Sequence, residues 1–357
     1  MINVTKTFLP PQSEYGSILT RAWNSGWITN RGELVKELEE RLKLRLGVSH
    51  VLAMTNGTLP IQIAIKALDL SGEIITTPFS YVATSSSIVW EDCTPIFVDI
   101  DPEHLTIDET KIEAAITSDT SAILATHVYG NPCHVEAIHT IAQKHELKVI
   151  YDAAHCFEVQ FGGKSLFEYG DLSSCSFHAT KLFHTGEGGA LFTQSEELYN
   201  LLFSYHNFGH EGPEKIKHLG INAKMSELQA AMGLAVLPYM DEIISARKKI
   251  VETYQKGLGD LNLKFQKIRA GTRWNYSYFP VIFDSEAQLI KVQSALNVAD
   301  IFPRRYFYPS LNTLPYVMPS SCPVAESIAE RVTCLPLYHN LDIGDVQRII
   351  SIIKESL

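Results

Sequence analysis

The chain has 357 residues, more than a single hydrophobic core typically uses, which predicts two domains. Hydrophobic residues make up 45% of it and charged residues 20%, the composition of an ordinary soluble globular protein. The net charge of −10 argues against a broad nucleic-acid-binding surface, so local groups must hold any anionic ligand.

The first residues, MINVTKTFLPPQSEYG, lack a charged stretch followed by an apolar one and therefore predict no signal peptide. No apolar run reaches the roughly 18 residues that a membrane helix needs. Six scattered cysteines without a CxxC pair are typical of reduced thiols in the cytosol. We therefore expect a cytoplasmic protein that binds neither nucleic acid nor membrane.

Short β-branched runs alternate with helical patterns between about residues 32 and 250. In the first expected helix, GELVKELEERLKLRLG (32–47), Leu34, Leu38 and Leu42 recur on one face. The next expected elements are the strands EIITTP (73–78), PIFVDI (95–100), SAILATHV (121–128) and KVIYDAA (148–154), with helices such as KIEAAIT (111–117) and HVEAIHTIAQKHE (134–146) between them. Such alternation predicts a largely parallel sheet covered by helices on both faces.

The pattern changes after about residue 240. YMDEIISARKKIVETYQKGLGDL (239–261) predicts one long helix, and the aromatic TRWNYSYFPVIF (272–283) predicts a strand. We therefore expect a large α/β domain in residues 1–240 and a smaller C-terminal α/β domain in residues 241–357. The N-terminal segment is the part of 1–240 that could join the smaller domain.

Ligands of open α/β sheets bind at the carboxyl ends of strands, so polar residues that follow the strands are the candidate site. Gly57 and Thr58 precede a helix with Pro60 in its first turn, where free N–H groups could bind an anion. An ordinary helix cap explains the same residues. Tyr81 follows the strand 73–78, where its ring could stack on a flat cofactor or fill the core.

Asp152 follows a strand that we expect to be buried, where a carboxylate needs a partner. A protonated pyridine nitrogen is one such partner, because this pairing keeps a pyridoxal ring acting as an electron sink. A loop-capping role explains Asp152 equally well. His155 could bond a ring oxygen or fill a core position.

Lys181 lies in SFHATKLFHTGEGGA (176–190) after a further expected strand, and so would emerge at the same edge as Asp152. A lysine in a confined apolar place has a lowered pKa and can form a Schiff base, although most single lysines are solvated charges. Ser176 is placed to reach a phosphate. Three glycines, Gly186, Gly188 and Gly189, allow a tight turn back into a strand.

Together these segments resemble the DegT/DnrJ/EryC1/StrS family of sugar aminotransferases, a pyridoxal-phosphate group of fold type I with an aspartate aminotransferase-like fold. The resemblance runs nearly from end to end of the chain. It rests on the ordered motifs SGWITNRGELVKELEERL, TNGT, PFSYVAT, PIFVDIDPEHLTID, HVYGNP, YDAAH, SFHATK…GEGGAL, HNFGHEG, GINAKMSELQAAMG and CLPLYHNL.

The resemblance implies a role for each matching residue. Lys181 would form the Schiff base with pyridoxal 5′-phosphate and move the proton between cofactor and substrate. Asp152 would bind the pyridine nitrogen, His155 would approach the ring hydroxyl, and Tyr81 would stack on the ring. The phosphate would be held by Gly57, Thr58, Ser176 and, from the neighbouring subunit, Asn222. The resemblance therefore implies an obligatory homodimer, in which Lys224 stands where many relatives have arginine.

The same resemblance implies a two-step transamination. L-glutamate would give its amino group to the cofactor, and pyridoxamine phosphate would then aminate a keto sugar carried on a nucleotide. SFHATKLFHTGEGG and the VTKTFLPP start are most similar to enzymes that aminate C4 of dTDP-4-dehydro-6-deoxyglucose, whose product, dTDP-4-amino-4,6-dideoxyglucose, is used in O-antigen or other surface-glycan synthesis. Amination of C3 of a 3-keto sugar is the alternative. Expected sugar or nucleotide contacts are Trp27, Thr29, Asn30, His184, Arg304, Arg305 and Tyr308.

Three other interpretations stay open at this point. A dehydrating branch of the family has histidine at the lysine position, and Lys181 argues against it. A zinc site built from His127, Cys133, His134 and His139 lacks a helical i, i+4 histidine pair, so we expect no metal site. A catalytically silent scaffold that retains the fold is the third, and the retained Lys181 and Asp152 favour an active enzyme. For Arg304 and Arg305, a solvated surface pair is the competing interpretation.

Overall fold

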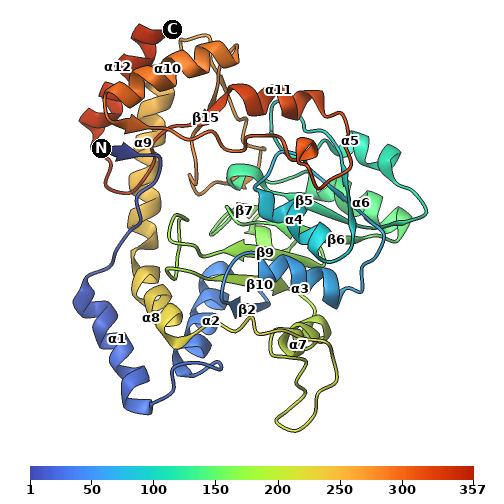
Figure 1. Ribbon diagram of the computed structural model, residues 1–357. Coiled ribbons are helices and arrows are strands. Elements are labelled where there is room, and N and C mark those ends of the chain that lie inside the picture. The colour runs from blue at the N-terminus through green and yellow to red at the C-terminus, as the bar shows by residue number, and fades with distance from the viewer.

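A seven-stranded sheet forms the centre of the computed structural model, which describes every residue from Met1 to Leu357 (Figure 1). The strand order is β2-β10-β9-β6-β5-β3-β4, and only β10 runs antiparallel to its neighbours. The strands are β2 (His50–Met54), β3 (Glu73–Thr76), β4 (Thr94–Phe97), β5 (Thr120–Thr126), β6 (Lys148–Asp152), β9 (Leu172–Ser176) and β10 (Gly189–Thr193). The predicted, mostly parallel sheet is therefore confirmed.

Helices cover both faces of this sheet (Figure 1). One face packs against α2 (Glu33–Leu46), α6 (Val135–His145) and α8 (Glu227–Val236), and the other against α3 (Leu59–Ala67), α4 (Val82–Trp90) and α7 (Glu196–Tyr205). Because side chains alternate along a strand, Ile123 of β5 packs on the α2 side and Leu124 on the α3 side. The helix α1 (Gln12–Ser25) packs on α8, and the helix expected at 111–117 is reduced to α5 (Glu109–Ile112) followed by a 3₁₀ turn.

The C-terminal part begins with α9 (Met240–Leu258), the long helix expected there. Its other elements are β11 (Lys264–Phe265), β13 (Pro280–Ile282), α10 (Glu286–Val298), β14 (Ile301–Phe302), α11 (Pro323–Arg331), β15 (Val332–Cys334) and α12 (Ile343–Ser356). β1 (Ile2–Asn3) pairs with β14, and Ile2 belongs to the apolar core of α9, α10 and α12, so both termini lie at this end of the molecule (Figure 1). No helix combines the length and the apolar composition that a membrane span needs.

The strand predicted over residues 272–283 is wrong in its middle. Only its two ends, β12 (Thr272–Arg273) and β13, form strands. β12 pairs with β7 (Gln160–Phe161), which pairs in turn with β8 (Lys164–Ser165). Between β12 and β13, Arg247 of α9 donates hydrogen bonds to the carbonyls of Tyr276 and Ser277. Asn275 in turn donates to the carbonyl of His155. These long-range bonds replace the ladder that the aromatic pattern predicts.

Burial of three histidines makes the stability of this fold depend on pH. Burial lowers the pKa of His127 from 6.5 to about 3, that of His206 to about 4, and that of His155 well below its usual value. Below pH 6.5 the unfolded chain therefore binds protons that the folded chain does not. The contribution of these neutral histidines to the free energy of unfolding is therefore fully present above pH 6.5. As the pH drops below this value, the free energy of unfolding falls by about 1.4 kcal/mol per pH unit for each histidine.

Replacing His127 with asparagine tests this dependence. The shorter amide side chain of H127N can still accept the N–H of Cys133, which His127 Nδ1 accepts at 3.0 Å, but it cannot bind a proton. We expect the free energy of unfolding of H127N, measured by urea denaturation between pH 6.5 and 5, to fall less steeply than that of the parent. Equal slopes for the two proteins would contradict the assignment of His127 as a buried neutral group.

Candidate active site

A cavity of about 260 Å³ lies at the carboxyl ends of β5, β6 and β9. Thr126, Asp152 and Ser176 are the last residues of these strands, and Lys181 follows β9 in the loop to β10. This is the edge at which open parallel sheets bind ligands. Of the residues expected from the sequence, the cavity is lined by Gly57, Thr58, Tyr81, Asp152, His155, Ser176, Lys181 and Arg304.

The turn before α3 lies directly against the end of β9. A Cβ atom added to Gly57 would lie 2.6 Å from Ser176 Cβ, and one added to Gly189 would lie 2.2 Å from the Asn56 carbonyl oxygen, so only glycine fits at both positions. Asn56 Oδ1 accepts the N–H groups of Thr58 and Leu59, both at 2.9 Å, which corrects the expectation that these amides are free. The Gly57 N–H and the hydroxyls of Thr58 and Ser176 remain as donors at the cavity.

Lys181 carries an amine suited to nucleophilic attack. Its Nζ lies 5.9 Å from the ring centroid of Tyr278, within the same cavity. Burial lowers the pKa of this amine, and the acidic groups of Tyr306 and Asp152 oppose that effect only in part. A lowered pKa increases the fraction of uncharged amine at neutral pH, which is the form that attacks a carbonyl.

Asp152 is a buried carboxylate that makes no ion pair within the chain. Its Oδ2 accepts a hydrogen bond from Thr84 Oγ1 at 2.7 Å, and its Oδ1 accepts one from the Ala154 N–H at 3.1 Å. Burial raises the pKa of Asp152, while the hydrogen bonds and the charge of Lys181 lower it. A buried carboxylate facing a cavity without a cationic partner is suited to a ligand that brings a positive charge.

His155 is fixed as a neutral hydrogen-bond donor. Its Nδ1 accepts the Tyr129 N–H at 3.2 Å, so in the uncharged ring the proton resides on Nε2. Burial lowers the pKa of His155 well below its usual value, which keeps the ring uncharged. The ring lies parallel to Phe307, with the centroids 5.8 Å apart. His155 therefore offers one N–H to an acceptor in the cavity.

This donor set fits pyridoxal phosphate. The hydroxyl and amide donors near Gly57 suit a phosphate, Asp152 suits a protonated ring nitrogen, and the His155 N–H suits a ring hydroxyl. Lys181 suits the aldehyde carbon. Nowhere do three or more His, Cys, Asp or Glu side chains come together in an arrangement that could hold a metal ion.

Several expected substrate contacts lie outside this cavity. His184 is buried, with its Nε2 2.6 Å from the Phe8 carbonyl oxygen and its Nδ1 accepting the Gly186 N–H. Arg305 bonds Glu286 at 2.8 Å, and its guanidinium lies 3.7 Å from the ring centroid of the exposed Tyr308. Arg304, by contrast, lines the cavity and makes no ion pair.

The remaining expected residues are exposed on another surface. Trp27, Thr29, Asn30 and Asn222 do not line the cavity around Lys181. Asn30 and Lys224 line a separate hollow of about 580 Å³, together with Asn207. Asn222 Oδ1 accepts a hydrogen bond from Lys224 Nζ at 2.7 Å, which leaves the amide N–H groups of Asn222 free. Asn30 therefore lies near Lys224 and its partner Asn222, outside the cavity that holds Lys181 of the same chain.

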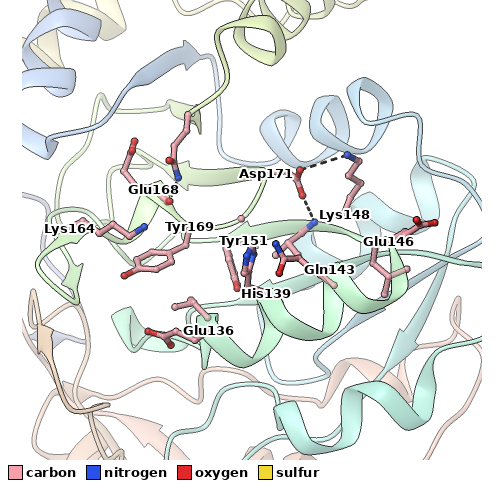
Figure 2. Close-up of a pocket in the computed structure, with 16 residues that line it drawn as sticks. Glu136, His139, Gln143, Glu146, Lys148, Tyr151, Lys164, Glu168, Tyr169 and Asp171 are labelled. Atoms are coloured by element: carbon pink, nitrogen blue, oxygen red, sulfur yellow. Dashed lines mark hydrogen bonds and ion pairs between the residues drawn. The ribbon is translucent and has the colours of Figure 1, made fainter.

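A third cavity, of about 590 Å³, lies at the opposite edge of the sheet (Figure 2). Its walls include Lys148, the first residue of β6, and, before β9, Lys164 and residues 168–171. Figure 2 shows Asp171 between Lys148 Nζ and the start of β6, where it accepts the Val149 N–H at 2.7 Å. None of the residues expected at the active site lines this cavity.

Several polar and aromatic residues that line the active-site cavity were not expected from the sequence. Ser80 and Thr126 lie beside Asp152, Tyr278, Tyr306 and Phe307 form an aromatic wall, and His178 and Glu187 form a pair 3.4 Å apart. Ser80 stands within the motif PFSYVAT, and His178 and Glu187 stand within SFHATKLFHTGEGGA. Their positions in these motifs were the signal that could have found them.

Comparisons with known proteins agree with this geometry. Residues 12–354 match the sequence model of the DegT/DnrJ/EryC1/StrS aminotransferase family. The chain is 41% identical to the dTDP-4-amino-4,6-dideoxy-D-glucose transaminase of Shigella dysenteriae, over 99% of this chain and 98% of the relative. It is 39% identical to the Escherichia coli protein of the same name, over the same shares of the two chains.

A solved structure has the same fold. The structure of DesI in the presence of its TDP-sugar product superposes with a TM-score of 0.94 and 32% sequence identity, covering 99% of this chain and 92% of that chain. Because the superposition covers 99% of this chain, the two structures share the sheet, the helices on both of its faces and the C-terminal elements.

Proposed function

The chain belongs to the DegT/DnrJ/EryC1/StrS aminotransferase family, and we propose that it transfers the amino group of L-glutamate to C4 of dTDP-4-dehydro-6-deoxy-D-glucose. It is a pyridoxal-phosphate-dependent sugar aminotransferase. The product would be dTDP-4-amino-4,6-dideoxy-D-glucose, a precursor for O-antigen or another surface glycan. The observation that carries the proposal is the meeting of Lys181, Asp152 and the phosphate donors in one cavity of a chain with this family membership.

Bound pyridoxal phosphate supplies an aldehyde that accepts the amino group and a ring that withdraws electrons. Lys181 would hold the cofactor through its amine and would carry a proton to and from the substrate carbon. Asp152 would hold the ring nitrogen in its protonated form. His155 would donate its Nε2–H to the ring oxygen, Tyr81 would cover the ring, and Gly57, Thr58 and Ser176 would hold the phosphate.

We infer the aminated carbon of the sugar and the nucleotide that carries it from the relatives and from the position of Arg304. Two relatives at 41% and 39% identity carry the C4 transaminase name, and DesI was solved with a TDP-sugar. Arg304 lines the cavity without an ion-pair partner, so its guanidinium is available to the diphosphate of a nucleotide sugar. Amination at C3 is the alternative, and the position of the new amine in the product decides between the two.

The amino donor is tested with the holoenzyme by visible absorption before and after addition of L-glutamate. We expect glutamate alone to remove the yellow band of the lysine-bound cofactor and to release 2-oxoglutarate, because the first half-reaction needs no sugar. A band that persists with glutamate, but is lost with another amino acid, would reassign the donor. A protein that cannot take up pyridoxal phosphate would overturn the proposed cofactor roles.

We also propose that the working enzyme is a homodimer with shared sites. Asn222 lies outside the cavity of its own chain, and Lys224 holds its Oδ1 so that the amide N–H groups face outward. Two exposed aromatic residues, Trp27 (55%) and Phe208 (49%), belong to the loops beside it, and large apolar groups of this kind suit a protein interface. We propose that Asn222 reaches the cofactor phosphate of the partner chain.

Mixing two inactive variants tests the shared site. K181A lacks the reacting amine, and N222A lacks the donor that the partner site would use. In dimers that contain one chain of each kind, one site combines an intact Lys181 with an intact Asn222. We expect a random mixture to recover about a quarter of the parent activity, measured as 2-oxoglutarate release. An activity equal to the sum of the two separate variants would contradict the shared site.

A further inference from the structure

Three buried hydroxyl groups form a chain that ends at the Asp152 carboxylate. Thr126 Oγ1 donates to Ser80 Oγ at 3.0 Å, and Ser80 Oγ lies 2.7 Å from Thr84 Oγ1. Thr84 Oγ1 donates to Asp152 Oδ2 at 2.7 Å. All four side chains are no more than 5% exposed. Each of these hydroxyls therefore has a protein partner.

The strand order of the sheet sets the geometry of this chain. Asp152 ends β6, Thr126 ends the adjacent strand β5, and Ser80 follows β3, the next strand in the sheet. Thr84 lies in the first turn of α4, which covers that edge. The hydroxyls thus cross three neighbouring strand ends, and their spacing depends on the rigid sheet rather than on a surface loop.

Each hydroxyl has one hydrogen, which fixes the direction of the chain. An ionised carboxylate can only accept, so the hydrogen of Thr84 points to Asp152. Ser80 must then donate to Thr84, and Thr126 donates to Ser80. All three O–H dipoles point toward the carboxylate, and hydrogen bonds aligned in this way strengthen one another.

We infer that Thr126, Ser80 and Thr84 form a one-way hydroxyl chain that positions the Asp152 carboxylate and stabilises its negative charge, which makes Thr84 a positioning residue for the cofactor ring nitrogen. The inference rests on the proposed role of Asp152. No cation pairs with this carboxylate in the chain, and its titratable neighbours are Lys181, Cys156 and Cys175. Burial penalises its charge, so the hydrogen bonds from Thr84 and Ala154 carry the stabilisation until a protonated ring arrives.

The test compares two probes, pyridoxal phosphate and its 1-deaza analogue, in which carbon replaces the ring nitrogen. The analogue cannot carry the ring proton that Asp152 binds. We expect T84V to weaken the binding of pyridoxal phosphate to apoenzyme by about tenfold, with little effect on the analogue. We expect a smaller loss for S80A and the smallest for T126V, since each is one hydroxyl further from the carboxylate.

Two variants serve as controls. Ser87 of the same helix α4 has a buried hydroxyl without any partner, so S87A should leave the affinity for both probes unchanged. T84S keeps the hydroxyl and should retain most of the affinity that T84V loses. If T84V weakens the binding of both probes equally, the variant has a packing defect and the inference is overturned. Unchanged affinity of T84V for pyridoxal phosphate would also overturn it.

The variant D152N separates this inference from the proposed role of Asp152. If D152N removes the preference for pyridoxal phosphate over the analogue while T84V keeps it, the hydroxyl chain is overturned and the role of Asp152 stands. If D152N itself keeps the preference, the proposed role of Asp152 fails, and the chain fails with it. Loss of the preference in D152N and in T84V supports both.

Discussion

Replacing Lys181 with alanine lowers transamination by about 10³-fold or more, because the variant loses both the covalent attachment of the cofactor and the base that moves the proton. The side chain lies in the cavity with Asp152, His155 and Tyr278, and burial lowers the pKa of its amine. Single-turnover assays with glutamate check the rate. Borohydride reduction followed by peptide mass analysis checks the attachment, which we expect at Lys181 in the parent and nowhere in K181A.

Lys164 provides a matched control for this variant. Its Nζ lies 4.1 Å from the ring centroid of Tyr169, in the cavity at the opposite edge of the sheet (Figure 2). K164A should retain the activity and the labelled lysine of the parent. Near-parental turnover in K181A, or labelling of a lysine other than Lys181, would remove Lys181 from the reaction.

Replacing Asp152 with asparagine lowers the rate of both half-reactions by about 10²–10³-fold, the loss expected when one preorganised electrostatic contact is removed from a buried site. Asparagine keeps the shape of the side chain and can still accept the Thr84 hydroxyl, so the change is mainly the loss of charge. Without that charge the ring nitrogen is no longer held in its protonated form, and the ring withdraws electrons less well.

Rates of glutamate deamination and of sugar amination, measured separately, check this expectation. Asp92 is exposed and remote from the cavity, so D92N should behave as the parent does. A D152N protein that binds its substrates less tightly but turns over at the parental rate would show that Asp152 acts in binding rather than in the reaction.

Sequence patterns predict the sheet and the meeting of Lys181 with Asp152. Both follow strands of one parallel sheet, and the carboxyl ends of such strands share an edge, so two residues 29 positions apart (181 − 152) reach one cavity. The family, the fold class and the enzyme class expected from the motifs are confirmed. The roles of the individual site residues remain proposals.

Other features depend on contacts that no local pattern encodes. His184 lies three residues from Lys181, yet its ring turns away to the carbonyl of Phe8, some 176 positions earlier in the chain. The aromatic segment 272–283 has the composition of a strand, but bonds from Arg247 and to the His155 carbonyl interrupt it. The hydroxyl chain to Asp152 could not be predicted from the sequence either, because single serine and threonine residues give no periodic pattern.

The expected division at residue 240 stays a prediction. Ile2 packs with α9, α10 and α12, which joins the N-terminal strand to the C-terminal part. A further core combines Phe79 and Tyr129 of the sheet region with Ile328 of α11, so apolar contacts cross the expected boundary. Sequence composition marks where the pattern changes, but not how far the two parts share a core.

The most direct test of the central claim is the product formed from L-glutamate and dTDP-4-dehydro-6-deoxy-D-glucose by the holoenzyme. We expect stoichiometric 2-oxoglutarate and a dTDP-sugar in which nuclear magnetic resonance locates the new amine on C4. An amine on C3 of a 3-keto substrate, with no reaction of the 4-keto sugar, would contradict the proposed substrate. No aminated sugar from either substrate would contradict the proposed function.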